Sequence, residues 1–262
     1  MSSAQNQYTN EMKRKFGYYA TWNPGVPLKL GDIGIFKRNV FTRISGLDDF
    51  NISFEVRPDT TKTPLEHNSQ GSVTITTKLS GTVAPQGSVL TDIDAGIIVE
   101  FSKENSTLFK ANNTVTPSIK DTIQLGKEII SLFKEGKWDK NWVVITELVE
   151  AESATIIISN TSNSKIELKA NANVGAANFD IADAKFEFSP QFTRGLETKI
   201  ISAEGLTPLF KVMGMKTRLF APPIFRSNSL KALDKITPYT AQNECKDSLY
   251  FEEITDLDIS EQ

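Results

Sequence analysis

The sequence contains little of the side-chain chemistry that most enzymes and metalloproteins use. It has one histidine, His67, and one cysteine, Cys245, in 262 residues. One histidine supplies neither the pair that zinc sites commonly use nor, in a polar stretch such as that around His67, an evident Ser-His-Asp arrangement. One cysteine forms no intramolecular disulfide, and the acidic residues around Cys245 disfavour its thiolate. We therefore expect no disulfide framework, no metal and no cofactor.

Long apolar runs and nucleotide-binding glycine motifs are missing too. No run approaches the roughly 20 apolar residues of a membrane-spanning helix, and the first seven residues lack the apolar core of a secretory signal. The spacing in Gly31-Asp-Ile-Gly fits no phosphate-binding loop. Asp92 and Asp94 share one strand face, as acid–base pairs can, but alternate acids are more often a strand's polar face. We expect a soluble cytoplasmic protein, and an enzyme is the least favoured class.

Charge is distributed unevenly along the chain. Residues 241–262 contain seven acids and one lysine, a net charge of −6, so residues 1–240 carry +3 of the total of −3. Lys211, Lys216 and Arg218 begin a basic segment that continues to residue 239, directly before this acidic tail. The two segments either neutralise each other or are separately solvated. No basic stripe with interleaved aromatic residues is present, so we expect no nucleic-acid partner.

The longest regular pattern lies in residues 72–102. Apolar and polar residues alternate up to Val83, and again from Val89 to Phe101, on either side of Ala84-Pro85-Gln86-Gly87. This alternation predicts two antiparallel strands. Each predicted arm has about ten residues, near the length with which a tilted strand crosses a bilayer. The same pattern is also typical of a long hairpin in an ordinary half-buried sheet.

The chain's first segment predicts a helix over residues 3–18. Tyr8, Met12 and Phe16 recur every four residues and share a face. The basic cluster Lys13, Arg14 and Lys15 lies beside them. Such a helix either packs on a sheet with a solvated charged face or lies on anionic lipid.

Further along, residues 57–70 are polar and contain two prolines, which indicates a loop, and residues 109–115 are expected to connect to a helix. That helix is predicted to start at Thr116 as N-cap and Pro117 as first residue, and to end at Gly136. Its predicted apolar face contains four residues, Ile119, Ile123, Ile130 and Phe133.

The second half is again β-like. Residues 153–159 are rich in β-branched residues, and residues 165–174 alternate on the other side of a polar turn, which predicts a second long hairpin. Residues 181–188 and 196–203 are predicted strands, and Thr207-Pro208 is expected to start a short helix that reaches Met215. The predicted fold class is α+β: a twisted, mostly antiparallel sheet with long amphipathic hairpins and several packed helices. We expect one domain over residues 1–240, followed by the acidic tail 241–262.

This order of elements resembles the pore-forming domain of gasdermins. The motifs Gly17-Tyr-Tyr-Ala-Thr-Trp-Asn-Pro-Gly and Leu30-Gly-Asp-Ile-Gly are most similar to the fungal gasdermin-type regulators of cell death, which act in allorecognition. The resemblance implies a protein that binds acidic phospholipids (cardiolipin, phosphatidylserine, phosphoinositides), oligomerises, and inserts hairpins into the plasma membrane as a barrel, causing lytic cell death. Its partner would be a second copy or an allelic counterpart.

The resemblance also implies roles for individual residues. The lipid-binding cations would be Lys13, Arg14, Lys15, Lys211, Lys216 and Arg218. The membrane-inserting, lipid-facing residues would be Val73, Ile75, Leu79, Ile97, Val99, Ile156, Ile158, Ile166 and Leu168. The lumen-facing residues would be Thr74, Thr76, Lys78, Asp92, Asp94, Lys165, Glu167 and Lys169.

Two questions stay open at the level of sequence. The patterns alone also fit a soluble β-rich binding or scaffold module with no membrane activity. The large C-terminal inhibitory domain of animal gasdermins has no counterpart here, so either the acidic tail restrains assembly or a partner triggers it.

Overall fold

The structure is a computed structural model that describes residues 3–171, 180–218 and 248–254. Its centre is strand β10 (Trp142–Ser159), which pairs along one side with β13 (Leu196–Arg218). On its other side β10 pairs in turn with β2 (Asp32–Lys37), β9 (Ser118–Ile119) and β8 (Thr107–Thr114). Most side chains of β10 are buried on both faces, which suits its run of β-branched residues.

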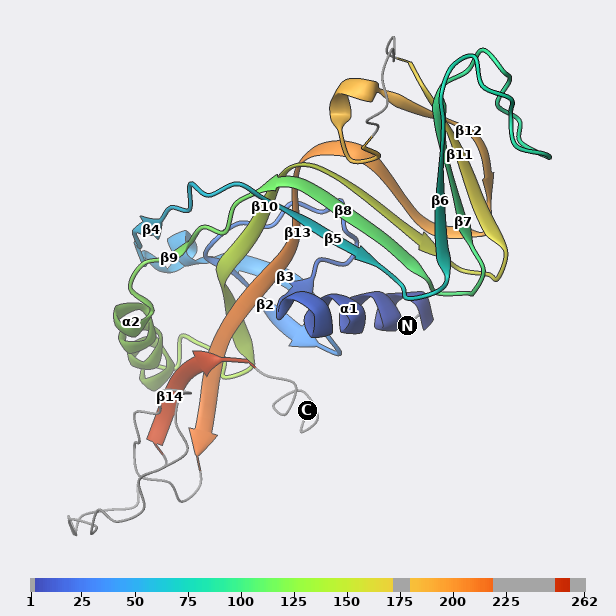
Figure 1. Cartoon of the computed structure of the whole chain (residues 1–262). Helices are drawn as coiled ribbons and strands as arrows, with labels where there is room; N and C mark the ends of the chain where they lie inside the picture. The colour runs from blue at the N-terminus through green and yellow to red at the C-terminus, as the bar shows by residue number, and fades with distance from the viewer. Residues whose placement is uncertain (1–2, 172–179, 219–247, 255–262) are drawn as a thin grey trace, which may run out of the picture.

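Five shorter strands complete this ten-stranded sheet, which curls into a half-barrel (Figure 1). They are β1 (Tyr19–Ala20) and β14 (Ser248–Glu253) against β13, β3 (Val40–Gly46) against β2, β4 (Val56–Arg57) against β9, and β5 (Thr63–Asn68) against β8. A 3-10 helix, η1 (Leu47–Phe50), follows β3.

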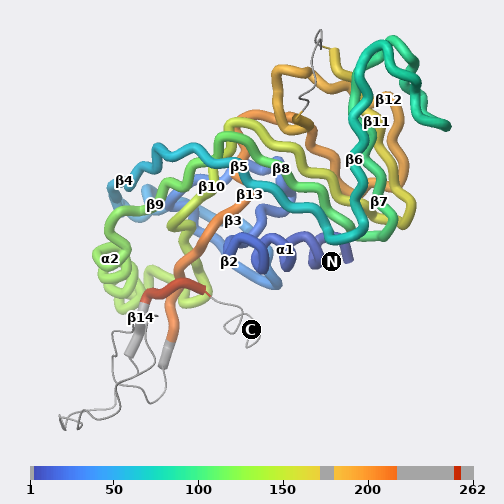
Figure 2. Tube along the Cα trace, in the orientation of Figure 1, coloured from blue at the N-terminus to red at the C-terminus, as the bar shows by residue number. Residues whose placement is uncertain are grey.

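A second antiparallel sheet has the strand order β12-β11-β7-β6. Its strands are β6 (Val73–Lys78), β7 (Gly96–Phe101), β11 (Ser164–Ala170) and β12 (Phe188–Arg194), with a 3-10 helix, η2 (Ala184–Phe186), before β12. Strands β6 and β7 form one hairpin, and β11 and β12 form another. Figure 2 shows that these two hairpins, far apart in the sequence, lie side by side at one end of the large sheet. We call them together the hairpin sheet.

Two α-helices are described, α1 (Ser3–Phe16) and α2 (Thr122–Lys134). The expectation of several packed helices is therefore wrong for the described residues, while the α+β class with mostly antiparallel sheets is confirmed. Helix α1 matches the helix predicted over residues 3–18. It packs on one face of the large sheet, and the hairpin sheet packs on the other.

Several predicted local structures are wrong because distant pairing overrides the local signal. Residues 57–70 contain strand β5 and residues 109–115 belong mostly to β8; the two pair with each other. Pro117 does not start a helix, because its carbonyl accepts a hydrogen bond from Leu148 and the next residues form β9. Asp121 is the actual N-cap of α2 and accepts from the backbone of Gln124.

The predicted face of this helix is also wrong in part. Leu125 and Ile129 are buried, whereas Ile123 is 71% exposed and Ile119 lies in β9. The helix predicted from Thr207 is absent, since that segment continues β13. The strand predicted over residues 181–188 is instead η2 followed by β12.

The two predicted hairpins have different outcomes. Strands β6 and β7 pair in antiparallel register, with Val73 opposite Phe101, which confirms the first hairpin, although both strands are shorter than predicted. The second is wrong, because the end of β10 pairs with β8 and β13 while β11 pairs with β7 and β12. Residues 172–174 of that prediction lie outside the described residues.

Candidate functional site

The apolar stripe of α1 is part of the core. Tyr8 and Met12 are fully buried and Phe16 is partly buried, in a cluster with Phe109 of β8 and Val149 of β10. Phe16 and Phe109 have ring centroids 5.7 Å apart. In this structure the stripe therefore packs on the sheet, and the helix offers its cations rather than its apolar face to the surroundings.

A buried carboxylate fastens α1 to the edge strand β5. Glu11 accepts hydrogen bonds from the Ser69 hydroxyl at 2.7 Å and from the side-chain amide of Gln7 at 3.0 Å, and its other contact is His67 Nε2 at 2.9 Å. Burial by itself raises the pKa of Glu11, but the contacts with His67, Gln7 and Ser69 outweigh it and hold that pKa below its usual range. His67, the only histidine, thus has a structural partner.

The predicted cations of α1 differ in their surroundings. Arg14 and Lys15 are exposed, whereas Lys13 is partly buried with its Nζ 3.9 Å from the centre of the Tyr19 ring. Lys211 of β13 lies 4.7 Å from the neighbouring ring, Tyr18, so α1 and β13 bring two predicted lysines to consecutive tyrosines.

Glu147 of β10 contacts both Tyr18 and Lys211. It accepts a hydrogen bond from the Tyr18 hydroxyl and lies 3.1 Å from Lys211 Nζ. Burial, together with the hydrogen bond to Glu147 and the charge of that residue, raises the pKa of Tyr18, so this tyrosine stays a neutral donor. Lys211 is therefore already paired with a carboxylate, and an anionic lipid would compete with Glu147 for it.

The other two predicted cations of β13 lie beside the acidic tail. Lys216 and Arg218 are opposite Tyr250 and Ser248 of β14, which belongs to residues 241–262. The side chain of Arg218 lies outside the described residues, as do the basic residues from 219 to 239 and residues 241–247, with Cys245, and 255–262 of the tail. Within the described part, six residues of the tail form an edge strand along β13.

Sequence reasoning missed two cations beside α1. Lys37, the last residue of β2, and Arg38, in the tight turn between β2 and β3, are both exposed. Asn39 of that turn donates a hydrogen bond to Asn10 of α1 at 2.9 Å. Arg38 and Asn39 both have positive φ, as a two-residue hairpin turn requires. In the sequence, the Arg-Asn pair between two short β-like runs is the feature that could have predicted this turn.

The hairpin sheet has one apolar face, which we call the inner face. Ile97 and Val99 of β7, with Ile166 and Leu168 of β11, are buried there against Leu108 and Ile157 of the large sheet. Among the other residues predicted to insert, Val73 is partly buried in the same cluster, Leu79 is partly buried just after β6, and Ile75 is 36% exposed.

Ile156 and Ile158 are not part of this sheet. Both are fully buried in β10, on the face of the large sheet that α1 covers. Because β10 pairs with β8 on one side and β13 on the other, these residues hold the large sheet together. The structure therefore brings seven of the nine predicted inserting residues to the hairpin sheet and its loop, and separates these two.

The opposite, outer face of the hairpin sheet is polar and charged. Lys165 Nζ lies 2.7 Å from Glu167, and Lys169 Nζ lies 2.6 Å from Asp94. Thr74 and Thr76 are exposed on the same face. Asp94 also accepts from the backbone and hydroxyl of Thr91, whereas Asp92 accepts from the backbone of Ala84, so the two aspartates have separate partners.

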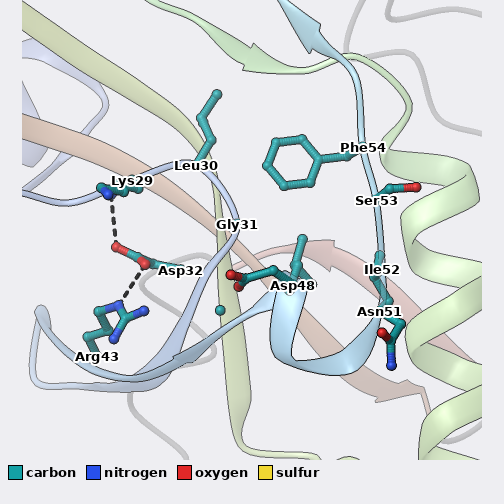
Figure 3. Close-up of a pocket in the computed structure, with 12 residues that line it drawn as sticks. Lys29, Leu30, Gly31, Asp32, Arg43, Asp48, Asn51, Ile52, Ser53 and Phe54 are labelled. Atoms are coloured by element: carbon teal, nitrogen blue, oxygen red, sulfur yellow. Dashed lines mark hydrogen bonds and ion pairs between the residues drawn. The ribbon is translucent and has the colours of Figure 1, made fainter.

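A pocket of about 600 Å³ lies where the loop before β2 meets η1 (Figure 3). Asp32, almost fully buried, accepts hydrogen bonds there from the backbone of Lys29 at 2.8 Å and from Arg43 Nε at 2.7 Å. Leu30 and Phe54 contribute apolar walls. Since both Asp32 oxygens have partners, this carboxylate serves the fold of the β2–β3 hairpin.

Within the described ranges, no group of three or more His, Cys, Asp or Glu side chains is placed to hold a metal ion. Neither of the described helices is long and apolar enough to cross a membrane. The chain matches no model of a known protein family, and no curated protein sequence is significantly similar to it.

Proposed function

We propose that this chain is a pore-forming protein of the gasdermin type, which binds acidic phospholipids, oligomerises and inserts its hairpins into a membrane to cause lytic cell death. One observation carries the proposal. Two hairpins from separate parts of the chain share a single four-stranded antiparallel sheet with an apolar inner face and a charged outer face.

Such a sheet has the side-chain pattern that a membrane barrel requires. Lipid contains no water to satisfy backbone groups, so inserted strands must close into a barrel, and four strands per chain require many copies. The inner face would then turn to lipid and the outer face to the lumen. Among the described strands, β6 and β12 are the two edge strands of this sheet, and each leaves one side of its backbone for a neighbouring copy or an allelic counterpart.

The cations around α1 supply the first contact with the membrane. Arg14 and Lys15 are exposed, and Lys37 at the end of β2 and Arg38 in the turn that follows it are exposed nearby. Basic residues near an anionic membrane surface each contribute about 1 kcal/mol. We infer recognition of phosphatidylserine, cardiolipin or phosphoinositides, with the protein in the cytoplasm before assembly and at the plasma membrane afterwards, in allorecognition or innate defence.

A soluble scaffold or binding module is the second candidate, and strand length favours it. Strands β6 and β7 have six residues each, and β11 and β12 have seven. A membrane-spanning strand needs about 9–11 residues. Pore formation therefore requires these strands to lengthen, whereas a scaffold could use them as they are.

Dye release from liposomes that contain phosphatidylserine or cardiolipin tests the proposal, with flotation as a separate measure of binding. Arg14→Glu/Lys15→Glu should weaken binding at least about thirtyfold, because each lost cation removes about 1 kcal/mol and each new acid repels the surface. The control, Lys127→Glu/Lys134→Glu on α2, makes the same charge change, and Lys134 also lies in the last turn of its helix.

We expect the wild type and the α2 variant to bind and release dye, and the α1 variant to lose both. Rings on anionic liposomes in negative-stain images would support assembly. If the wild type neither floats nor releases dye with either lipid, alone or with an allelic counterpart, the pore proposal is wrong and the scaffold candidate remains.

A further inference from the structure

The loop that joins β6 to β7, residues 79–95, covers part of the outer face of the hairpin sheet. Three residues on that face are almost completely buried, namely Lys78, Ile98 and Glu167, at 2%, 3% and 1% exposure. Figure 1 shows the loop leaving the end of β6 and bending toward the side of the sheet that faces away from β8 and β10. A polar strand face is ordinarily solvated, and the hydrogen bonds that join Lys78 and Glu167 to the loop show that the loop contributes to this burial.

Charged side chains of the sheet hold the loop in this position. Glu167 accepts hydrogen bonds from the Ser88 hydroxyl at 2.6 Å and from the backbone of Val89 at 2.9 Å. Lys78 donates to the carbonyl of Asp94 at 2.8 Å and to that of Asp92 at 3.2 Å. The ion pair of Lys169 with Asp94 adds a third attachment. We call Lys78, Asp94, Glu167 and Lys169 the latch.

The sequence of the loop is also suited to longer strands. In the pairing of β6 with β7, Val73 is opposite Phe101 and Lys78 is opposite Gly96. Continued without a shift, this register places Val83 opposite Thr91 and leaves residues 86–88 as the turn. That turn already exists, because Ser88 donates its backbone N–H to Pro85 and Gly87 has a positive φ of 78°.

The same extension would give the exposed apolar residues of the loop a common face. Val83, Val89 and Ile93 are 85%, 51% and 81% exposed, and in the continued register they join the side of Val73 and Val99. The arms would then run over residues 73–85 and 89–101, which exceeds the about 9–11 residues that a spanning strand needs.

We propose that the latch keeps loop 79–95 folded against the outer face, and that its release lets the loop extend the β6–β7 hairpin in unchanged register. This inference rests on the proposed function for its purpose, but the latch can be measured without a membrane. Glu167 is its centre, because it is the most buried member and binds the middle of the loop, whereas Lys78 and Lys169 bind the loop's end.

The test is hydrogen exchange of residues 79–95 in the soluble protein, comparing Glu167→Gln with Glu100→Gln. Glu100 lies on the same face, is 53% exposed and is the other carboxylate near Lys165, at 3.6 Å, so the control removes an equal charge without touching the loop. We expect exchange in 79–95, at Val89 above all, to rise about tenfold or more in Glu167→Gln and to stay at the wild-type rate in Glu100→Gln.

A second variant guards against a folding defect. Ser88→Ala removes one loop donor and leaves the sheet intact, so it should raise exchange in the same segment by a smaller factor, while exchange in β10 stays unchanged. Equal exchange of 79–95 in wild type, Glu167→Gln and Ser88→Ala would overturn the latch.

Dye release then separates the two proposals. If the latch restrains insertion, Glu167→Gln should release dye from phosphatidylserine liposomes faster than the wild type and Glu100→Gln. Raised exchange with no dye release from any variant would leave the latch in place and contradict pore formation. Dye release by the wild type, with exchange of residues 79–95 unchanged in Glu167→Gln and Ser88→Ala, would support pore formation and contradict the latch.

Discussion

At the scale of single residues, groups that look reactive in the sequence have structural partners in the fold. Glu11 and His67 are 56 positions apart and meet in a buried contact that joins α1 to β5. A buried carboxylate is stable only when its hydrogen bonds are made, and Glu11 has three partners. The sequence did not predict this contact, because residues 57–70, which contain β5, were expected to form a loop.

Replacing Glu11 by glutamine should destabilise the protein by about 1–3 kcal/mol at pH 7, since the buried partners lose a charged acceptor. The folded-state pKa of Glu11 is lowered, so its contribution is present above the unfolded pKa of about 4.3 and is lost as pH falls through the folded pKa. Urea unfolding at pH 7 and at about pH 3 measures this. Glu104→Gln is the control, because Glu104 is exposed and lines the same surface cavity as Glu11. A difference in stability between Glu11→Gln and wild type that is the same at both pH values would contradict the assignment.

Two isoleucines that the sequence places in the same class should behave differently. Ile156→Ala should cost about 2–5 kcal/mol, because the side chain is fully buried in the central strand. Ile75→Ala, at 36% exposure in an outer strand, should cost less than about 1.5 kcal/mol. Chemical denaturation of both variants measures the two losses in unfolding free energy. Similar losses would mean that β6 is as well packed as β10.

At the scale of elements, the sequence predicts best where local pattern and tertiary pairing agree. The β6–β7 hairpin was predictable because alternation and a turn specify it without help from the rest of the chain. The β7–β11 pair was not, since it joins Ile98 to Glu167, and β8, β9, α2 and β10 lie between these two strands in the sequence. Thr116-Pro117 and Thr207-Pro208 imitate helix starts, but their backbone groups bond to Leu148 and Thr21 instead. Lys13, Arg14 and Lys15 were correctly placed on a helix, and Lys37 and Arg38 were not considered because the sequence did not place them beside it.

Strand β14 gives a prediction at this scale. Phe251 packs in the core cluster below α2, where a side chain at Gly126 would come within 3.0 Å of the Phe251 Cβ. Phe251→Ala should cost about 2 kcal/mol, roughly half the cost for a fully buried phenylalanine. Glu253→Ala, exposed on the same strand, should cost little. If both variants unfold at the wild-type denaturant concentration, β14 contributes no stability to the fold.

At the scale of the whole molecule, the two sheets differ in how firmly they are built. Strand β10 is paired on both sides and covered on both faces, by α1 and by the hairpin sheet. Among the described strands, β6 pairs with β7 alone, and its residues 74–77 are exposed. Local opening follows the density of buried contacts, so the hairpin sheet should open at a lower free energy than the large sheet.

Native-state hydrogen exchange at rising, sub-denaturing concentrations of guanidinium should therefore show β6 and β7 exchanging before β10 and β13. Strand β3 is the control, because it too is an edge strand but packs Phe41 into the core of the large sheet. If edge position alone decided the order, β3 would open together with β6. If β6 opens first and β3 opens with β10, the hairpin sheet is a separate cooperative unit. A protein needs such a unit if it is to refold its hairpins while the rest of the fold stays intact. Simultaneous opening of β6, β7, β10 and β13 would contradict this division.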